Sequence, residues 1–212
     1  PAEGKLIRYL GNYSGENMVE KIRKENCYGC GACEQRCVKK CIQMVTDEEG
    51  FIYPRVNREL CSMCGICSAV CPSNNIKKPV DFAVETRVAY ANDSQLRMNS
   101  SSGGLFSLLA TSVINRRGVV FGARMNEDHL VDHTMVEDAE GLEKLRGSKY
   151  LQSRIGTAYK ETENQLRLGR VVLFVGTACQ IAGLKSFLSK DYSNLYTIDV
   201  LCHGVPSEKV WK

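Results

Sequence analysis

Two runs of closely spaced cysteines limit what this chain of 212 residues can fold into. The first, CYGCGACEQRC, spans residues 27–37, and the second, CSMCGICSAVC, spans residues 61–71. Each run orders its four cysteines as C-x2-C-x2-C-x3-C, and nine of the eleven cysteines lie between positions 27 and 71. Such a cluster indicates disulfides in a secreted chain but a metal site in an intracellular one.

The spacing is that of the ligand run in bacterial ferredoxins, including the proline, Pro72, after the second run. One tight loop can bring three thiolates to a cubane 4Fe–4S cluster, and two-cluster ferredoxins supply the fourth thiolate crosswise. Structural zinc is the alternative, but zinc sites favour paired C-x2-C arms over triplets. We therefore expect one cluster on Cys27, Cys30, Cys33 and Cys71, and the other on Cys61, Cys64, Cys67 and Cys37.

An internal repeat supports this interpretation. A shift of 34 residues superposes all four cysteines of the two runs and places Gly31 on Gly65. Glycine at these positions permits positive φ and turns N–H groups toward the sulfurs. The segments 42–45 and 51–56 flank an acidic turn and predict a β-hairpin. We predict an α+β ferredoxin-like dicluster domain with a βαββαβ pseudo-repeat at residues 21–78, after an N-terminal extension at residues 1–20.

Two residues depart from the ferredoxin pattern. Val38 follows Cys37 where the pattern has proline, and Cys41 is a ninth cysteine. Cys41 either covers the cluster as a small apolar residue or replaces Cys37 as a ligand. The spacing favours Cys37 as the ligand.

Charge and hydropathy exclude several classes of function. The formal net charge is +4, and residues 21–78 account for all of it with ten basic and six acidic side chains. Two clusters of about −2 each would cancel that excess, which removes the support for a nucleic-acid partner. The longest apolar run, residues 171–184, is interrupted and too short for a membrane span.

The first 20 residues carry five charged side chains and do not resemble a secretory signal. We therefore expect a cytoplasmic protein. The chain has no initiator methionine and stops at Lys212 where a helix begins, so we expect a fragment of a longer chain.

Residues 81–212 have few cysteines and alternate between strand and helix patterns after a short linker at residues 77–79. This pattern predicts an α/β domain, truncated at its C-terminus. The predicted strands are residues 87–91, 119–124, 129–137, 171–175 and 195–201, and the predicted helices are residues 105–116, 154–168 and 181–188. We expect 171–175 and 195–201 to be buried, parallel strands.

Polar residues gather where the predicted strands end and helices begin, which is where α/β sheets bind ligands. Ser101, Ser102, Gly103 and Gly104 precede a helix and could hold a phosphate or simply cap the helix. Lys149, in the loop RGSKY, could also contact a phosphate, although exposed lysines are usually only solvated.

Two cysteines follow the predicted parallel strands. Cys179, in GTACQ, lies near a helix N-terminus, where the thiolate is favoured. Cys202 follows the next strand in LCHG, and His203 beside it is placed for proton transfer. The two sulfurs would emerge at one sheet edge and could face one substrate. His129 and His133 are four residues apart, but their segment alternates like a strand, which argues against a metal pair.

The stretches SSSGGLFS, RGSKYLQS, VGTACQIAGLKSFL and YTIDVLCHGVPS, downstream of a double ferredoxin run, resemble the family of coenzyme F420 hydrogenase/dehydrogenase beta subunits. The resemblance covers residues 25–212, although Ala178 stands where the family usually has proline in GTPCQ.

The resemblance implies an iron–sulfur flavoprotein oxidoreductase with two 4Fe–4S clusters, FAD and an acceptor such as the deazaflavin coenzyme F420. It also implies a small-molecule substrate and, as protein partner, a ferredoxin or a redox partner subunit. The expected catalytic residues are Cys179, Cys202 and His203, and the expected cofactor-binding residues are Ser101, Ser102, Gly103, Gly104, Lys149, Gly176, Thr177 and Gln180. The alternative is an electron-transfer module without chemistry of its own that docks to a partner enzyme.

Overall fold

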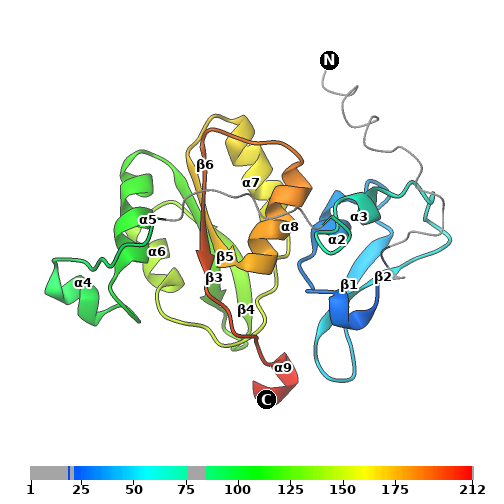
Figure 1. Cartoon of the computed structure of the whole chain (residues 1–212), viewed down its shortest axis with the longest axis horizontal. Helices are drawn as coiled ribbons and strands as arrows, with labels where there is room; N and C mark the ends of the chain where they lie inside the picture. The colour runs from blue at the N-terminus through cyan, green and yellow to red at the C-terminus, as the bar shows by residue number, and fades with distance from the viewer. Residues whose placement is uncertain (1–18, 20–21, 76–84, 212) are drawn as a thin grey trace.

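A computed structural model describes residue 19 and residues 22–75 and 85–211. These residues form a cysteine-rich unit, residues 22–75, and an α/β unit, residues 85–211 (Figure 1). Among the helices of these ranges, none has both the length and the apolar character that a membrane span requires.

The cysteine-rich unit is built around one hairpin. Strands β1 (Ile42–Thr46) and β2 (Ile52–Val56) pair antiparallel, with Ile42 opposite Val56, as the sequence predicts. Two short helices, α2 (Ala32–Arg36) and α3 (Ile66–Ala69), each follow the first cysteines of a run. Gly31 and Gly65 begin these helices with φ of 71° and 74°, a left-handed conformation that favours glycine. The two cysteine runs therefore share one local conformation.

The outer strands of the predicted pseudo-repeat differ from the prediction or lie outside the described residues. Residues 22–26 contain a short 3-10 helix, η3 (Lys24–Asn26), instead of the expected strand. The reason is local hydrogen bonding, because the N–H groups of Asn26 and Cys27 bond to the carbonyls of Arg23 and Lys24. The segment 76–84, where the last strand was expected, lies outside the described residues.

The α/β unit contains a mixed four-stranded sheet. Its strands are β3 (Val119–Met125), β4 (Val131–Val136), β5 (Val172–Thr177) and β6 (Leu195–Val200), in the order β4-β3-β5-β6. β3 and β4 form an antiparallel hairpin, whereas β3, β5 and β6 run parallel. This arrangement confirms the predicted pairing of β3 with β4 and the predicted parallel direction of β5 and β6.

Helices cover both faces of this sheet. Helices α5 (Leu105–Asn115) and α6 (Ala139–Leu145) lie on one face, and α7 (Ala158–Arg167) and α8 (Ala178–Leu188) lie on the other (Figure 1). Alternate strand residues supply the two cores: Phe121 and Phe174 pack with α7 and α8, whereas Val120 and Leu173 pack with α5 and α6. Two shorter helices, α4 (Ser94–Met98) and α9 (Glu208–Trp211), lie outside the sheet.

Three predictions for this unit are corrected. Residues 87–91 are not a strand, because Val88 and Tyr90 are 98% and 64% exposed and have no core to cover them. The helix predicted at 154–168 begins at Ala158, because the backbone of Arg154 pairs with β4. β6, predicted to be buried, is an edge strand with half-exposed side chains, because β5 is its only partner strand among the described residues.

The two units share one interface. Ala32 and Val70 of the cysteine-rich unit belong to the same buried core as Leu184 and Phe187 of α8. Gln35 is buried there, and its Oε1 accepts the N–H groups of Tyr159 and Lys160 at 3.1 and 3.2 Å. A side chain of one unit therefore caps the first turn of helix α7 in the other.

A second contact lies at the tip of the hairpin. The hydroxyl of Ser207 donates to the carbonyl of Glu49, and the Lys209 ammonium donates to the carbonyl of Glu48 at 2.6 Å. Glu208 is buried and forms a bidentate ion pair with Arg154, which fixes the start of α9. The turn of the hairpin is thus held against the α/β unit.

Candidate metal centres and the adjoining sheet edge

The structure assembles the first predicted set of thiols. Cys27, Cys30, Cys33 and Cys71 line one partly open pocket. Burial raises the pKa of Cys33 well above its usual value, and the charges of the other three sulfurs raise it further. The fourth thiol therefore reaches the first three from the second run, as crosswise ligation requires.

Around the second predicted set of four thiols lies a fifth sulfur, that of Cys41. Burial raises the pKa of Cys67, and the charges of Cys64 and Cys61 add to this increase. The sulfur of Cys41 lies 3.3 Å from that of Cys37 and also hydrogen-bonds with Cys61. Both candidates for the fourth ligand are therefore next to the triplet.

The hydrogen bonds favour Cys37 as the fourth ligand. Burial raises its pKa, but the N–H groups of Cys41, Lys39 and Ile42 and the thiol of Cys41 outweigh this effect and lower the pKa overall. Burial raises the pKa of Cys41 to about 12, and its contacts with Cys37 and Cys61 act in the same direction. Cys41 is therefore the weaker acid of the two, and the sulfur of Cys37 accepts backbone N–H groups as cluster ligands do.

The two candidates can be separated by substitution. Cys37→Ser is expected to remove one cluster and about half of the iron, because a hydroxyl is a poor substitute for a thiolate ligand. Cys41→Ser, the matched variant four residues away, is expected to keep both clusters. Iron analysis and electron paramagnetic resonance of the reduced proteins measure the outcome. The reverse result would make Cys41 the ligand.

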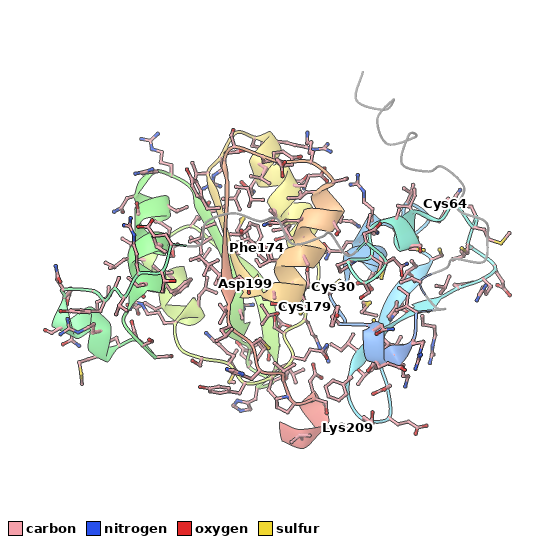
Figure 2. The ribbon with its side chains drawn as sticks, in the orientation of Figure 1. Cys30, Cys64, Phe174, Cys179, Asp199 and Lys209 are labelled. Carbon is pink, nitrogen blue, oxygen red and sulfur yellow. The ribbon has the colours of Figure 1, made fainter. Side chains whose placement is uncertain are left out.

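The chemistry of both thiol sets fits a 4Fe–4S cluster. Each set offers at least four sulfurs, and backbone N–H groups point at Cys27, Cys30 and Cys33 of the first set. Cys33 and Cys71 are buried, whereas Cys64 is exposed on the side away from the α/β unit (Figure 2). We call the first set the inner centre and the second set the outer centre.

The inner centre touches helix α8. A Cβ atom at Gly183 would lie 3.1 Å from the sulfur of Cys30 and 2.7 Å from Oη of Tyr159. Tyr159 is buried, and its hydroxyl donates to the carbonyl of Gln180 at 2.9 Å. Burial raises the pKa of Cys30 to about 12, with a smaller contribution from the charge of Cys179. Figure 2 shows Cys30 and Cys179 next to each other.

Sequence reasoning did not identify Gly183 or Tyr159. A signal for Gly183 exists, because glycine inside a helix costs about 1 kcal/mol relative to alanine and usually has a packing reason. Tyr159 carries no comparable signal.

The predicted catalytic residues lie at one edge of the sheet. β5 and β6 end at Thr177 and Val200, and Cys179 and Cys202 follow them at this carboxyl edge. Cys179 is partly buried and lies 3.2 Å from the hydroxyl of Thr177. Cys202 and His203 are exposed, and the sulfur of Cys202 accepts the N–H of Gly204 at 3.3 Å. Cys179 and Cys202 therefore lie at the same edge of the sheet, but their sulfurs contact different residues.

Two predicted cofactor-binding side chains cap helix α8. Oε1 of Gln180 accepts the N–H of Thr177 at 3.0 Å, and the two residues form a capping box. The amide of Gln180 also donates to the carbonyl of Ser153. Gly176 permits this packing, because a Cβ there would lie 3.0 Å from Oε1 of Gln180. The side chains of Thr177 and Gln180 therefore have structural partners.

The two predicted phosphate loops come together at the same edge. Oγ of Ser101 accepts the N–H of Ser148 at 2.9 Å. Gly104 begins α5 with φ of 80° and without a side-chain cap, which leaves N–H groups of the first turn available. The Lys149 ammonium, however, donates to the carbonyls of Leu145 and Arg146 at 2.8 and 2.7 Å. Burial lowers the pKa of Lys149 to about 8. Because its ammonium bonds to these carbonyls, Lys149 caps α6 instead of projecting as a phosphate ligand.

The remaining two members of the loop, Ser102 and Gly103, lie between Ser101 and α5. A Cβ at Gly103 would lie 3.0 Å from the carbonyl of Ala89, so this position favours glycine. His129 is exposed in the β3–β4 turn, whereas His133 is buried in β4 and bonds to Ser153 and Val175. The histidines therefore occupy different environments.

The cysteine-rich unit is similar to known ferredoxin domains. A family model described as a 4Fe-4S dicluster domain matches residues 13–76. An uncharacterized ferredoxin of Methanocaldococcus jannaschii is 36% identical over 55 residues, which are 26% of this chain and 70% of that protein.

A longer match extends into the α/β unit. A subunit of the F(420)H(2) dehydrogenase of Methanosarcina mazei is 26% identical over an alignment of 177 positions that covers 77% of this chain. The match covers 49% of that protein, so this chain spans about half of its length. The family indicated by the sequence motifs fits both comparisons: this chain is similar to an F(420)H(2) dehydrogenase subunit over most of its length, and its residues 13–76 match a 4Fe–4S dicluster domain.

Proposed function

We propose that this chain is an iron–sulfur flavoprotein subunit of an oxidoreductase. The dicluster domain transfers electrons, and the similarity to a dehydrogenase subunit indicates an oxidoreductase role. The proposal adds FAD in the α/β unit and a low-potential organic acceptor such as the deazaflavin F420. When bound, the clusters supply single electrons and the flavin exchanges them in pairs as a hydride. A redox partner protein completes the electron path.

The contact between Cys30 and helix α8 carries this proposal. The sulfur of Cys30 lies against Gly183, and Cys179 is one helical turn away, in the first turn of the same helix. Tyr159 is buried and lies near both sulfurs. The inner centre is therefore packed directly against the element that leads to the carboxyl edge.

The carboxyl edge offers groups for a phosphate-bearing cofactor. The first turn of α5 has no side-chain cap, and the loop at residues 101–104 supplies hydroxyls and backbone N–H groups. Such helix starts bind phosphate groups. Cys179, Cys202 and His203 follow β5 and β6 at this edge, where they would act on the substrate.

One observation favours the alternative of an electron-transfer module without chemistry. Lys149, Thr177 and Gln180 use their polar atoms in helix caps, and this leaves fewer side chains for a cofactor. In that alternative, the α/β unit docks to a partner enzyme.

Anaerobic purification followed by iron, sulfide and flavin analysis tests both possibilities. We expect about eight irons per chain, as two 4Fe–4S clusters require, together with flavin absorbance or uptake of added FAD. Protein that contains this iron but neither contains nor binds flavin would leave only the electron-transfer module. Protein that binds zinc or forms disulfides in place of iron would exclude both.

A further inference from the structure

Three segments meet around the outer centre at the end of the cysteine-rich unit away from the α/β unit (Figure 2). They are the turn 38–40, the turn 57–60 and the loop 61–64. The pairing of Ile42 with Val56 and the hydrogen bond from Asn57 N to Cys41 O bring the two turns together. The contact of Cys41 with Cys61 joins the loop to them. We call these residues, 38–40 and 57–64, the outer-cluster surface.

Large apolar side chains project from each segment of the outer-cluster surface. Val38 is 80% exposed, Met63 62% and Leu60 57%. Cys64, a predicted ligand, is exposed among them. Single exposed apolar residues need no explanation, but three on converging segments beside a ligand indicate a contact surface.

The charges on the outer-cluster surface are mostly positive. The surface carries three basic residues and one acidic residue, all of them exposed: Lys39, Lys40, Arg58 and Glu59. The acidic residues of the hairpin turn lie at the opposite end of the β1–β2 ladder, where Glu48 and Glu49 contact α9. The cysteine-rich unit is therefore polarised, with its basic end at the outer centre.

We propose that the outer-cluster surface docks an acidic one-electron carrier protein, an inference that rests on the proposed electron-transfer function. One electron leaves the reduced carrier and enters the centre held by Cys61, Cys64 and Cys67, so the carrier is oxidised and this chain is reduced by one electron. No bond forms and no proton moves. Exposed apolar residues provide the contact, and the lysines attract the carrier and orient it.

The composition of the surface favours a transient carrier over a permanent subunit. Permanent interfaces are large and apolar, whereas electron-transfer encounters use small surfaces with exposed charges. Here the two lysines lie directly beside Val38. Charge complementarity therefore selects an acidic partner that binds briefly.

Charge reversal tests the proposal in the full, cluster-loaded chain. The probe is a small acidic [2Fe–2S] ferredoxin, reduced beforehand, and stopped-flow absorbance follows its oxidation by the chain. Lys39→Glu/Lys40→Glu is expected to lower the second-order rate constant at least about tenfold at low salt. The difference should shrink as salt rises, since the Debye length falls from about 30 Å at 0.01 M to about 3 Å at 1 M.

Arg116→Glu/Arg117→Glu is the matched control. This adjacent, exposed pair follows α5, on the opposite face of the sheet from the cysteine-rich unit, and the substitution changes the charge equally (Figure 1). We expect it to leave the rate with ferredoxin nearly unchanged, and basic cytochrome c to react faster with the Lys39→Glu/Lys40→Glu variant.

Dithionite separates failure of this proposal from failure of the proposed function. If dithionite reduces the clusters of both variants normally but ferredoxin reacts with them at the same rate, the outer-cluster surface is not the docking site. Equal losses in the two variants would also overturn the proposal. Clusters that dithionite cannot reduce would instead count against the electron-transfer function itself.

Discussion

Gly183→Val is expected to detach the inner centre from helix α8 and to remove about half of the iron. The new side chain would occupy space that Cys30 and Tyr159 already fill, because even a Cβ atom would lie 3.1 Å from the sulfur of Cys30. The outer centre has no contact of this kind with α8 among the described residues, so its cluster should stay. The variant would therefore damage one centre selectively.

Two opposing effects decide the outcome at position 183. Alanine in place of glycine usually stabilises a helix interior by about 1 kcal/mol. Here its Cβ would lie 2.7 Å from Oη of Tyr159, and this ring cannot retreat because it packs between Phe174 and Phe187 at centroid distances of 5.8 and 5.9 Å. Overpacking costs about 1–3 kcal/mol, so Gly183→Ala should be destabilising on balance, and valine more so.

Urea unfolding and iron analysis of the same preparations measure both effects. Ser186→Ala, three residues further along α8, is the control for helix propensity and is expected to leave iron content unchanged. A Gly183→Ala variant that is more stable than the parent chain would contradict the packing argument. So would a Gly183→Val variant with a full complement of iron.

The two cluster centres could be predicted from the sequence because each depends mainly on residues that are close together in the chain. Six of the eight expected ligands lie in two tight loops, and the spacing of thiols in such a loop depends only on neighbouring residues. The four strands of the sheet and helices α5, α7 and α8 were predictable for a similar reason, since a buried face imposes a period on the sequence. Helices α4 and α6 were not predicted. Residues 87–91 show the limit, because Val88 and Tyr90 have no core to cover them.

The contact between the units could not be predicted in this way. Gln35 caps a helix that begins more than 120 residues later, and no periodic pattern links the two positions. The cofactor residues raise a different difficulty, because helix caps and ligand sites use the same polar side chains. Lys149 follows helix α6 and Gln180 lies in the first turn of α8, and only their hydrogen-bond partners distinguish the two roles.

His133 is expected to make the stability of the fold depend on pH. Its ring is buried and stacks on the ring of Phe174, with a centroid distance of 5.4 Å. Its Nε2 lies 3.0 Å from the carbonyl oxygen of Val175. Since a carbonyl only accepts, Nε2 carries the proton and Nδ1 accepts from the hydroxyl of Ser153. Burial lowers the pKa of His133 from 6.5 to about 4, although the Val175 carbonyl and the charge of Asp132 oppose this shift.

The sign of the effect follows from this shift. Between pH 4 and 6.5 the unfolded chain binds a proton at His133 that the folded chain does not, so acid favours unfolding. Stability is complete above pH 6.5 and decreases below it by up to about 3 kcal/mol, of which about 2 kcal/mol is lost by pH 5. His133→Gln removes this contribution, so the advantage of the parent chain over the variant should shrink by about 2 kcal/mol between pH 7.5 and 5.

Urea unfolding followed by circular dichroism at several pH values measures this difference. His129→Gln is the matched control, because His129 is exposed in the β3–β4 turn and its loss should leave the pH profile of the parent chain unchanged. Parallel profiles for the parent chain and His133→Gln would mean that the buried ring accepts a proton at little cost. In that case water or a rearranged Ser153 hydroxyl must reach Nδ1, and the packing of the ring on Phe174 would be looser than its 5.4 Å stacking distance implies.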